Sequence, residues 1–347
     1  MKAAAIAEKD MQVNTDRKKR KIVRRILLAL VALVVALLVF AFVSPLPVSM
    51  ALKIAFSRGN AVAPENYELI AARVTAVKDL TYPSGFKSNK ADIYYPKDGN
   101  GPFPVVLWIH GGAYVGGDKK DVELFATALA AEGFAVVCMN YQLAPGAKYP
   151  APVIQMGEAY LWLCEVATEY RLDMERFALA GDSAGAHIAA QFAAVQSNGA
   201  YAGEMKMEQL VLPGTLKSTL LFCGPFDSAK INAVDNPVLG FFLSRAAWAY
   251  FGSRSWAEQF SQQATVAGHI TADFPPTFIS DGNKMSFEDH ARDLAETLQG
   301  SGVPVETYFL DPSVEQAYHE YQFVMNTPAG REAFQKTLDF LNKYMAA

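Results

Sequence analysis

The sequence predicts an α/β fold in which helices cover both faces of a mostly parallel β-sheet, preceded by one membrane-spanning helix. From about residue 77 onward, short and uniformly apolar runs alternate with helical patterns, which is typical of a parallel sheet buried on both faces. Residues 26–43 are 18 consecutive apolar residues, long enough to cross a bilayer core as a helix. At 347 residues, the chain can form one large α/β domain besides that helix.

Positive charge is concentrated at the N-terminus. The first 25 residues carry nine Lys or Arg and three Asp or Glu, a net +6, whereas the remainder carries 22 and 32, a net −10. The positive-inside rule therefore predicts a cytoplasmic basic tail at 1–25, a signal anchor at 26–43 and an exported remainder at the cell membrane. The alternative is a cleaved signal peptide and secretion, although no clean small-x-small site follows the apolar run. Beside a spanning helix, the basic cluster is expected to contact membrane lipid and no nucleic acid.

The remaining elements follow in order along the chain. Residues 44–75 are expected to form a membrane-proximal segment with a short helix near 65–75, and residues 76–347 the main domain. This domain begins with two strands, 79–82 and 91–95, predicted to pair antiparallel across a Pro-Ser-Gly turn. Later strands are predicted at 104–109, 135–140, 177–180, 218–223, 277–280 and 305–310, and helices at 122–132, 151–170, 184–195, 287–299 and 330–344. Functional loops should lie at the carboxyl ends of the parallel strands.

The stretch Gly181-Asp182-Ser183-Ala184-Gly185 separates the predicted strand 177–180 from the predicted helix 184–195. A strand, a G-x-S-x-G turn and a helix together form the layout of a nucleophile elbow. Such a turn strains the serine backbone, so the neighbouring residues must be small for strand and helix to pass closely. Ser183 is therefore the candidate nucleophile, held at a helix N-terminus where amide donors favour negative charge.

A second motif, His110-Gly111-Gly112-Ala113-Tyr114-Val115-Gly116-Gly117, follows the strand at 104–109 directly. Its uncovered amides can stabilise the oxyanion of a tetrahedral acyl intermediate. We expect Gly111 and Gly112 to donate, with Ala184 completing the oxyanion hole. A phosphate-binding loop is disfavoured because the Lys-Ser/Thr ending and the G-x-G-x-x-G spacing are missing. His110 is interpreted as a structural residue that orders the loop.

Among the five histidines, His319 is the predicted general base. It lies in the loop after the last strand, at 305–310, so the chain order is serine, then acid, then histidine, as this type of architecture requires. His187 is expected to be buried one turn into the elbow helix. His269 falls in the predicted cap, and His290 lies on a helix.

The stretch 228–274 is too long for a plain connection and contains many aromatic residues, namely Phe241, Phe242, Trp248, Tyr250, Phe251 and Trp256. Their spacing fits amphipathic helices that fold over the site as a cap. Most of these side chains should serve packing, and some are expected to line an apolar pocket.

The three cysteines, Cys138, Cys164 and Cys223, each lie within an apolar run. We expect all three to be buried small hydrophobic residues that form neither a disulfide framework nor a metal site.

These motifs resemble those of the α/β-hydrolase fold, and within it the hormone-sensitive-lipase-like carboxylesterases with an HGG loop. Asn140-Tyr141-Gln142-Leu143-Ala144-Pro145, followed by Tyr149-Pro150-Ala151-Pro152, is similar to the family's Tyr-Arg-Leu-Ala-Pro segment. The resemblance implies a serine esterase that acts on small acyl esters without metal or cofactor. It implies Ser183 as nucleophile, His319 as base, and Gly111, Gly112 and Ala184 as the oxyanion hole.

The sequence departs from this family at the acid of the triad. Met285 stands where the family has an aspartate, in the segment Gly282-Asn283-Lys284-Met285-Ser286-Phe287. The acid must orient the imidazole and stabilise its charged form. Asp281 is preferred because it lies at a strand end, and the alternatives are Glu288, Asp227 and Asp289.

The sequence therefore predicts a membrane-anchored serine carboxylesterase acting on a small apolar ester. Amide or peptide hydrolysis would use the same machinery. An alternative from a different functional class is a non-catalytic surface binding module. The reason to consider it is Met285, which stands where the family has its catalytic aspartate. The sequence indicates no oligomeric state.

Overall fold

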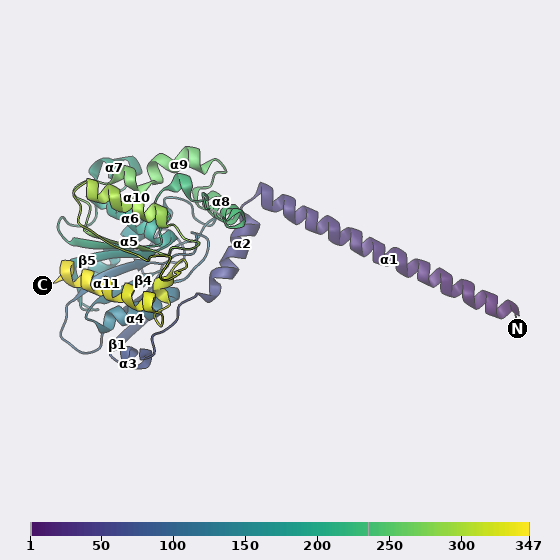
Figure 1. Ribbon diagram of the computed structural model, residues 1–347, viewed down its shortest axis with the longest axis horizontal. Coiled ribbons are helices and arrows are strands. Elements are labelled where there is room, and N and C mark those ends of the chain that lie inside the picture. The colour runs from purple at the N-terminus through teal and green to yellow at the C-terminus, as the bar shows by residue number, and fades with distance from the viewer. Residues whose placement is uncertain (1, 235, 347) are drawn as a thin grey trace. The chain divides into compact units, whose positions relative to one another are not determined.

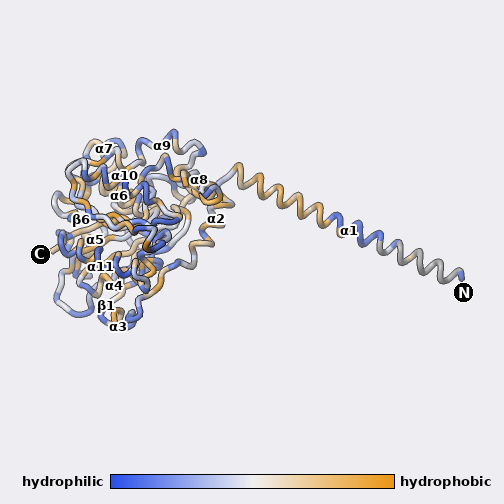
Figure 2. The backbone as a smooth tube through the Cα atoms, in the orientation of Figure 1, coloured by the Kyte–Doolittle hydropathy of each residue, from blue (hydrophilic) through white to orange (hydrophobic). Residues whose placement is uncertain are grey.

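The computed structural model describes residues 2–234 and 236–346, and the chain divides into two compact units, Met1–Val48 and Ser49–Ala347. The first unit consists mainly of α1 (Lys2–Val43). Its stretch Arg17–Val43 is long and apolar enough to cross a membrane, and no residue in the most apolar part of that stretch is buried. Figure 2 shows this hydrophobic stretch directly after hydrophilic residues. The predicted apolar helix at 26–43 is thus present.

The second unit is organised around an eight-stranded sheet with the order β1-β2-β4-β3-β5-β6-β7-β8. The strands are β1 (Val74–Thr81), β2 (Lys90–Pro96), β3 (Phe103–Ile109), β4 (Ala135–Met139), β5 (Leu172–Asp182), β6 (Leu216–Phe222), β7 (Thr277–Asp281) and β8 (Val305–Phe309). β2 pairs antiparallel with β1 and with β4, and all other neighbours are parallel. The predicted mostly parallel sheet and its antiparallel first pair are confirmed.

Helices cover both faces of this sheet, as Figure 1 shows. One face carries α5 (Ala151–Val166), α6 (Ala184–Ser197) and α10 (Glu288–Gly300), and the other carries α4 (Glu123–Ala131) and α11 (Pro328–Met345). The central strand β3 contributes to both cores because its side chains alternate. Val105, Leu107 and Ile109 pack on the first face, and Val106 and Trp108 on the second.

The remaining α-helices of this unit lie around the three-layer core. They are α2 (Leu46–Ala55), α3 (Tyr67–Ala71), α7 (Gly199–Met205), α8 (Pro237–Phe251) and α9 (Trp256–Ala264). The cap helix α8 is fixed to the glycine loop because the Tyr250 ring stacks on Tyr114, with 3.9 Å between centroids. His187, buried as predicted, hydrogen-bonds the Tyr114 hydroxyl at 2.8 Å and the carbonyl of Ala264 at 2.7 Å.

The cysteines only partly follow the prediction. Cys138 and Cys223 are buried, but Cys164 is exposed, and all three are free thiols. The apolar run Leu161–Cys164 lies on α5, where successive side chains are about 100° apart. Leu161 and Cys164, three residues apart, therefore face solvent together, while Trp162 is buried. Only one side of α5 faces the core at this point, so the four residues of the run are not all buried.

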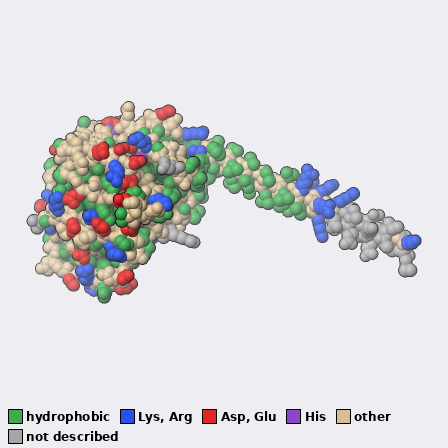
Figure 3. Space-filling view, viewed as in Figure 1, with side chains coloured by type: hydrophobic (Ala, Val, Ile, Leu, Met, Phe, Trp, Pro, Cys, Tyr) green, Lys and Arg blue, Asp and Glu red, His purple; other side chains and the backbone are tan. Residues whose placement is uncertain are grey.

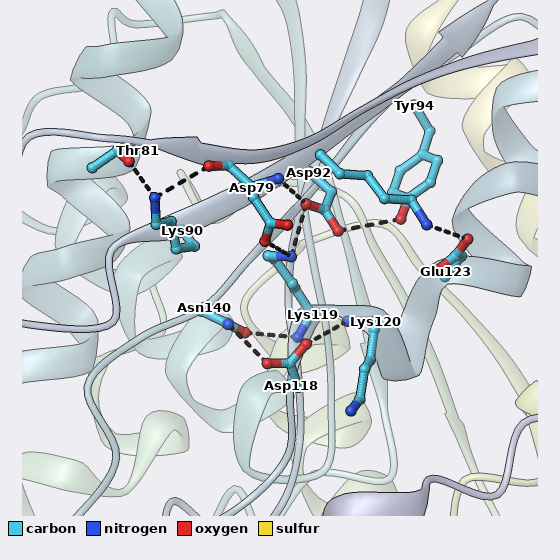
Figure 4. Close-up of polar contacts among 11 residues, drawn as sticks. Asp79, Thr81, Lys90, Asp92, Tyr94, Asp118, Lys119, Lys120, Glu123 and Asn140 are labelled. Atoms are coloured by element: carbon cyan, nitrogen blue, oxygen red, sulfur yellow. Dashed lines mark hydrogen bonds and ion pairs between the residues drawn. The ribbon is translucent and has the colours of Figure 1, made fainter.

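A buried lysine fixes the end of the glycine loop (Figure 4). Lys119 Nζ lies 2.8 Å from Asp92 Oδ1 on β2 and 2.9 Å from Asp79 Oδ1 on β1. Burial alone would lower the pKa of Lys119, but the hydrogen bonds to Asp92 and Asp79 outweigh it and raise that pKa. The backbone amide of Lys119 also donates to the side chain of Asn140, whose amide donates to Asp118. These contacts connect the loop after Gly117 to the sheet.

Replacing Lys119 by methionine is expected to lower the free energy of unfolding by about 3–5 kcal/mol, because the buried carboxylate of Asp92 loses its counter-charge. Denaturant unfolding of the full chain in mild detergent would measure this loss. Lys78→Met is a matched control, since Lys78 pairs with Glu123 at 2.6 Å but on the surface, where a pair is worth about 0–1 kcal/mol. Equal losses in both variants would contradict a structural role for the Lys119 pair.

Candidate active site

Ser183 lies on a strained turn between β5 and α6. Its backbone has φ 51° and ψ −122°, a combination that costs a non-glycine residue free energy and that only tight packing maintains. Gly181 and Gly185 make the turn possible. A Cβ on Gly181 would lie 2.5 Å from the carbonyl carbon of Gly185, and one on Gly185 would lie 2.0 Å from the Ile109 carbonyl oxygen. The side chain of Ser183 is thereby held at the carboxyl end of the central strands.

His319 reaches Ser183 from the loop that follows β8. Its Nε2 lies 2.9 Å from Ser183 Oγ. Asn283 holds this loop in place, because its side chain donates to the carbonyl of Glu315 at 2.9 Å and accepts from the amide of Ala317 at 3.1 Å. Burial lowers the pKa of His319 to about 4, so the imidazole is neutral at pH 7 and able to accept a proton. The predicted nucleophile and base are therefore within hydrogen-bonding distance.

The other ring nitrogen of His319 contacts a serine, not a carboxylate. Ser286 Oγ lies 2.7 Å from His319 Nδ1 and donates its own hydrogen to Asp281 Oδ1. A hydroxyl has a single hydrogen, so Ser286 must accept from Nδ1–H of the imidazole. This arrangement leaves Nε2 unprotonated toward Ser183. Asp281, the preferred acid, is fully buried at the end of β7, and burial raises its pKa to about 7.

The alternative acids have other partners. Asp227 accepts from the amide of Ala229 at 3.0 Å and caps a short 3-10 helix. Glu288 accepts from Arg292 Nε at 2.9 Å on the surface of α10, and Asp289 is exposed in the first turn of that helix. Met285, at the position of the family's aspartate, is 55% exposed. Among the candidates, only Asp281 is connected to His319 by a chain of hydrogen bonds within the described residues.

The glycine loop corrects one expectation for the oxyanion hole. The amide of Gly111 donates to Asp182 Oδ2 at 2.7 Å, so its hydrogen is directed at a carboxylate and away from a substrate oxygen. In the described part of the chain, no acceptor is found for the amides of Gly112 and Ala113. Ala184 is the first residue of α6, where an amide has no partner within the helix. These three amides are the available donors.

Two carboxyl groups lie beneath this loop, and no sequence motif predicts the second. Asp182 accepts from Trp108 Nε1 at 2.7 Å as well as from Gly111. Burial, and then the charge of Asp182, raise the pKa of Glu320 well above its usual range, so Glu320 is the protonated member of the hydrogen-bonded pair. Glu320 Oε1 lies 3.8 Å from His319 Nε2. Both carboxyls lie against Gly111, where an added Cβ would approach Asp182 Oδ2 to 2.5 Å and Glu320 Oε1 to 2.7 Å.

A cavity of about 400 Å³ opens beside Ser183 and His319. Its apolar lining comes from several segments and comprises Ala55, Phe56, Val234, Leu239, Leu243, Met285, Phe287, Tyr318 and Phe323. The residues contributed by the cap insertion are aliphatic, whereas the aromatic residues Tyr250, Phe251 and Trp256 are buried in the core. The expectation that some cap aromatics line the pocket is therefore wrong. Their rings instead pack against one another on the core-facing side of the cap.

A second cavity, of about 20 Å³, also borders Ser183. It is lined by small and aliphatic residues, namely Ala113, Ala184, Pro225, Ile231, Leu243, Ala246 and Ala247 among others. His319 borders the larger cavity but does not line the smaller one. The two cavities therefore differ in size and in their position relative to the imidazole.

Cys223, Asp281 and His319 offer metal-ligating atoms within 4.8 Å of one another. Both ring nitrogens of His319 are already engaged, by Ser183 and by Ser286. Cys223 Sγ accepts from the amide of Glu320 at 3.3 Å, and burial raises the pKa of its thiol. This donor set fits a protonated hydrogen-bond network better than a metal centre, because a thiolate is the form that binds metal.

Residues 91–293 match the family model described as BD-FAE. Carboxylesterase NlhH of Mycobacterium tuberculosis is 30% identical over 259 residues, covering 74% of this chain and 78% of the relative. Esterase LipI of the same organism is 32% identical over 240 residues, covering 68% and 71%.

Solved structures share the fold at lower identity. Esterase B from Lactobacillus rhamnosis superimposes with a TM-score of 0.70 at 20% identity, over 89% of this chain and 96% of the other. A bacterial heroin esterase gives a TM-score of 0.65 at 22% identity, over 85% and 97%. At this identity the superpositions establish the α/β-hydrolase architecture, including its helices on both faces of the sheet.

Proposed function

Since the chain belongs to the BD-FAE family of α/β-hydrolases and is a carboxylic ester hydrolase, we propose that it is a membrane-anchored serine carboxylesterase. The observation that carries the proposal is the 2.9 Å contact between His319 Nε2 and Ser183 Oγ. Its curated relatives are esterases, which favours ester over amide or peptide bonds. The same contact argues against a non-catalytic binding module, because such a module has no need for it.

The reaction begins when neutral His319 accepts the hydroxyl proton of Ser183 through Nε2. Ser183 Oγ then bonds to the carbonyl carbon of the ester, and the carbonyl π electrons move onto its oxygen. The amides of Gly112, Ala113 and Ala184 are placed to stabilise that oxyanion. The imidazolium returns its proton to the alcohol oxygen, the carbon–oxygen bond to the alcohol breaks, and the alcohol leaves. Water then repeats the two steps and releases the acid.

The acid of the triad acts through a hydroxyl in this proposal. Asp281 accepts from Ser286, which accepts from Nδ1–H of His319. The carboxylate thereby holds the imidazole in the tautomer that leaves Nε2 free, and it stabilises the imidazolium across one intervening group. The substitution of the family's aspartate by Met285 is thus compensated from the neighbouring strand end.

We assign the two parts of the ester to the two cavities from their position relative to His319, which lines only the larger one. His319 must deliver a proton to the leaving alcohol, so the alcohol occupies the cavity of about 400 Å³ that His319 lines. The acyl group then lies in the cavity of about 20 Å³ next to Ala184, which holds only a few heavy atoms. This favours esters of short acids, such as acetates, with an apolar alcohol.

The N-terminal helix supports the anchoring. A basic tail before an apolar stretch keeps the N-terminus cytoplasmic and leaves the ester-cleaving domain outside the cytoplasm. The full-length chain is then expected to remain in membranes washed with alkaline carbonate, with its intact mass confirmed by mass spectrometry. A chain shortened after residue 43 and released from those membranes would indicate a cleaved signal peptide instead.

The pH dependence of kcat/KM tests the two titrating groups. The neutral imidazole is the active form, so kcat/KM should rise as the pH increases through about 4, the pKa to which burial lowers His319. A second rise is expected near pH 7, where buried Asp281 loses its proton and becomes able to stabilise the imidazolium. Rates for p-nitrophenyl acetate between pH 3 and 9 would measure both steps. The second step should vanish in Asp281→Asn, and its persistence there would contradict the assignment.

A direct test of the proposed function combines turnover with active-site labelling. The detergent-solubilised full chain should hydrolyse p-nitrophenyl acetate, and a fluorophosphonate should inactivate it with one probe per chain. Peptide mass spectrometry should locate the probe on Ser183, because its Oγ attacks phosphorus as it attacks a carbonyl carbon. Absence of both turnover and labelling would overturn the proposal.

A further inference from the structure

One wall of the large cavity comes from the segment next to the membrane span. Ala55 and Phe56 line the cavity together with Gly59 and Asn60. This segment contacts the domain: a Cβ added to Gly116 of the glycine loop would lie 3.0 Å from the Phe56 ring. Further along, the amide of Val62 donates to the carbonyl of Phe323 at 2.8 Å.

The helix α2 and the cap helix α8 border the same cavity, through Ala55 on α2 and Leu243 on α8. Figure 1 shows the two helices next to each other. The chain that enters the domain from the membrane span therefore passes directly along the opening that leads to Ser183.

The segments that border the opening carry exposed apolar side chains, which we call the mouth patch. It consists of Met50, Ile54, Phe56, Val238, Met285 and Tyr318. Met50 and Ile54 are 64% and 72% exposed, and their spacing of four places them on one face of α2. Leu52, between them, packs on the core instead. In the view of Figure 3, hydrophobic side chains are exposed over the part of the domain that carries α2 and α8.

The covalent connection to the span identifies what covers this patch. α1 ends at Val43 and α2 begins at Leu46. Met50 follows Val43 by seven residues, so even a fully extended chain holds it within about 25 Å of the end of the span. Exposed apolar surface that is tethered so close to a bilayer meets lipid at a very high effective concentration. Clusters of this kind around a binding site are typical of membrane or protein contacts.

We propose that the mouth patch docks on the bilayer surface, so that the ester enters the large cavity directly from the membrane. The substrate class is then an ester of a short acid whose apolar alcohol is dissolved in lipid. The alcohol, which lies on the side of His319 and Phe56, would pass from the bilayer into the cavity without crossing water. This inference rests on the proposed esterase function and on the anchor, and it adds the source and the chemistry of the substrate.

The test compares two acetates that differ only in their alcohol. The full chain is reconstituted in phosphatidylcholine vesicles with either water-soluble butyl acetate or bilayer-dissolved hexadecyl acetate, and release of acetate is measured. Met50→Ser combined with Ile54→Ser removes apolar area from the mouth patch without changing a residue that lines the cavity. This variant is expected to lose about tenfold in kcat/KM for hexadecyl acetate. Its kcat/KM for butyl acetate should stay within about twofold of the wild type, since the chemistry is untouched.

The matched control is Leu69→Ser combined with Leu212→Ser, two leucines that are 73% and 68% exposed. Leu69 is on α3, away from α8 in Figure 1. Leu212 precedes the amino end of β6, whereas Ser183 follows the carboxyl end of the parallel strand β5. This control should retain both activities.

Three results would overturn the inference. The first is an equal loss of activity on both acetates in the Met50/Ile54 variant. The second is no loss on hexadecyl acetate in that variant. The third is that the two substitutions dissociate a dimer in detergent while activity on the two acetates stays in the same ratio. That result would assign the mouth patch to contact with a second copy of the chain. Failure of the proposed function looks different, because the wild type would then hydrolyse neither acetate.

Discussion

Replacement of Ser183 by alanine is expected to lower kcat/KM for p-nitrophenyl acetate by about 10⁵-fold, because the acyl-enzyme can no longer form. The structure places no other hydroxyl of the described residues within hydrogen-bonding distance of His319 Nε2. The residual rate should come from the oxyanion donors and binding alone, which leaves about 10³–10⁴-fold catalysis over water. Stopped-flow or long-term spectrophotometric assays of the detergent-solubilised chain would measure the loss.

Ser218→Ala is the control for this prediction. Ser218 is another fully buried serine of the central sheet, on β6, and it should leave the rate unchanged. Both variants should keep the wild-type unfolding midpoint, so that the loss in Ser183→Ala reflects chemistry. A Ser183→Ala enzyme that retains more than about 1% of the wild-type rate would show that another group is the nucleophile.

Ser183 and His319 can be predicted from the sequence, because the constraints on each of them leave a recognisable pattern along the chain. The elbow needs glycines on both sides of the serine, and that steric requirement leaves a readable motif: Gly181 and Gly185 touch backbone atoms that tolerate no side chain. His319 could be found from its order in the chain. The parallel sheet was equally predictable, since strands buried on both faces are uniformly apolar.

The residues that sequence reasoning missed depend on tertiary contacts. Gly111 was expected to donate to the oxyanion, yet its amide bonds to Asp182, a residue 71 positions away. Glu320 follows the histidine directly, but only the fold shows that it lies against Asp182 beneath the glycine loop. Ser286 is next to the substituted Met285, and a hydroxyl within five residues of a strand-end carboxylate was the signal that could have identified it.

The cavity lining could not be predicted for a similar reason. The aromatic residues at 241–256 were conspicuous in the sequence, but large rings gain most by burial in the core, and Tyr250 and Phe251 are buried there. The smaller aliphatic residues Leu239 and Leu243 remain to line the cavity. The contribution of Ala55 and Phe56 was missed because no local pattern indicates that a segment before the first strand returns to the active site.

The relay through Ser286 gives the second large effect. Ser286→Ala should lower kcat by about 10²–10³-fold, because Asp281 loses contact with the imidazole and no longer fixes its tautomer. Asp281→Asn should cost a similar factor, since an amide removes the charge that stabilises the imidazolium. KM for p-nitrophenyl acetate should change little, because neither side chain touches the acyl group or binds the ground state and the transition state equally.

The double variant distinguishes a relay from two separate roles. If Asp281 acts only through the hydroxyl of Ser286, the double variant should be no slower than the slower single variant, whereas independent contributions would multiply. Ser286→Thr, which keeps the hydroxyl, should recover part of the rate. Glu288→Gln and Asp227→Asn, the two rival carboxylates, should stay within about twofold of the wild type, because their contacts lie with Arg292 and Ala229. A rate near that of the wild type in Ser286→Ala, together with a severe loss in Asp281→Asn, would mean that the carboxylate reaches His319 directly during turnover.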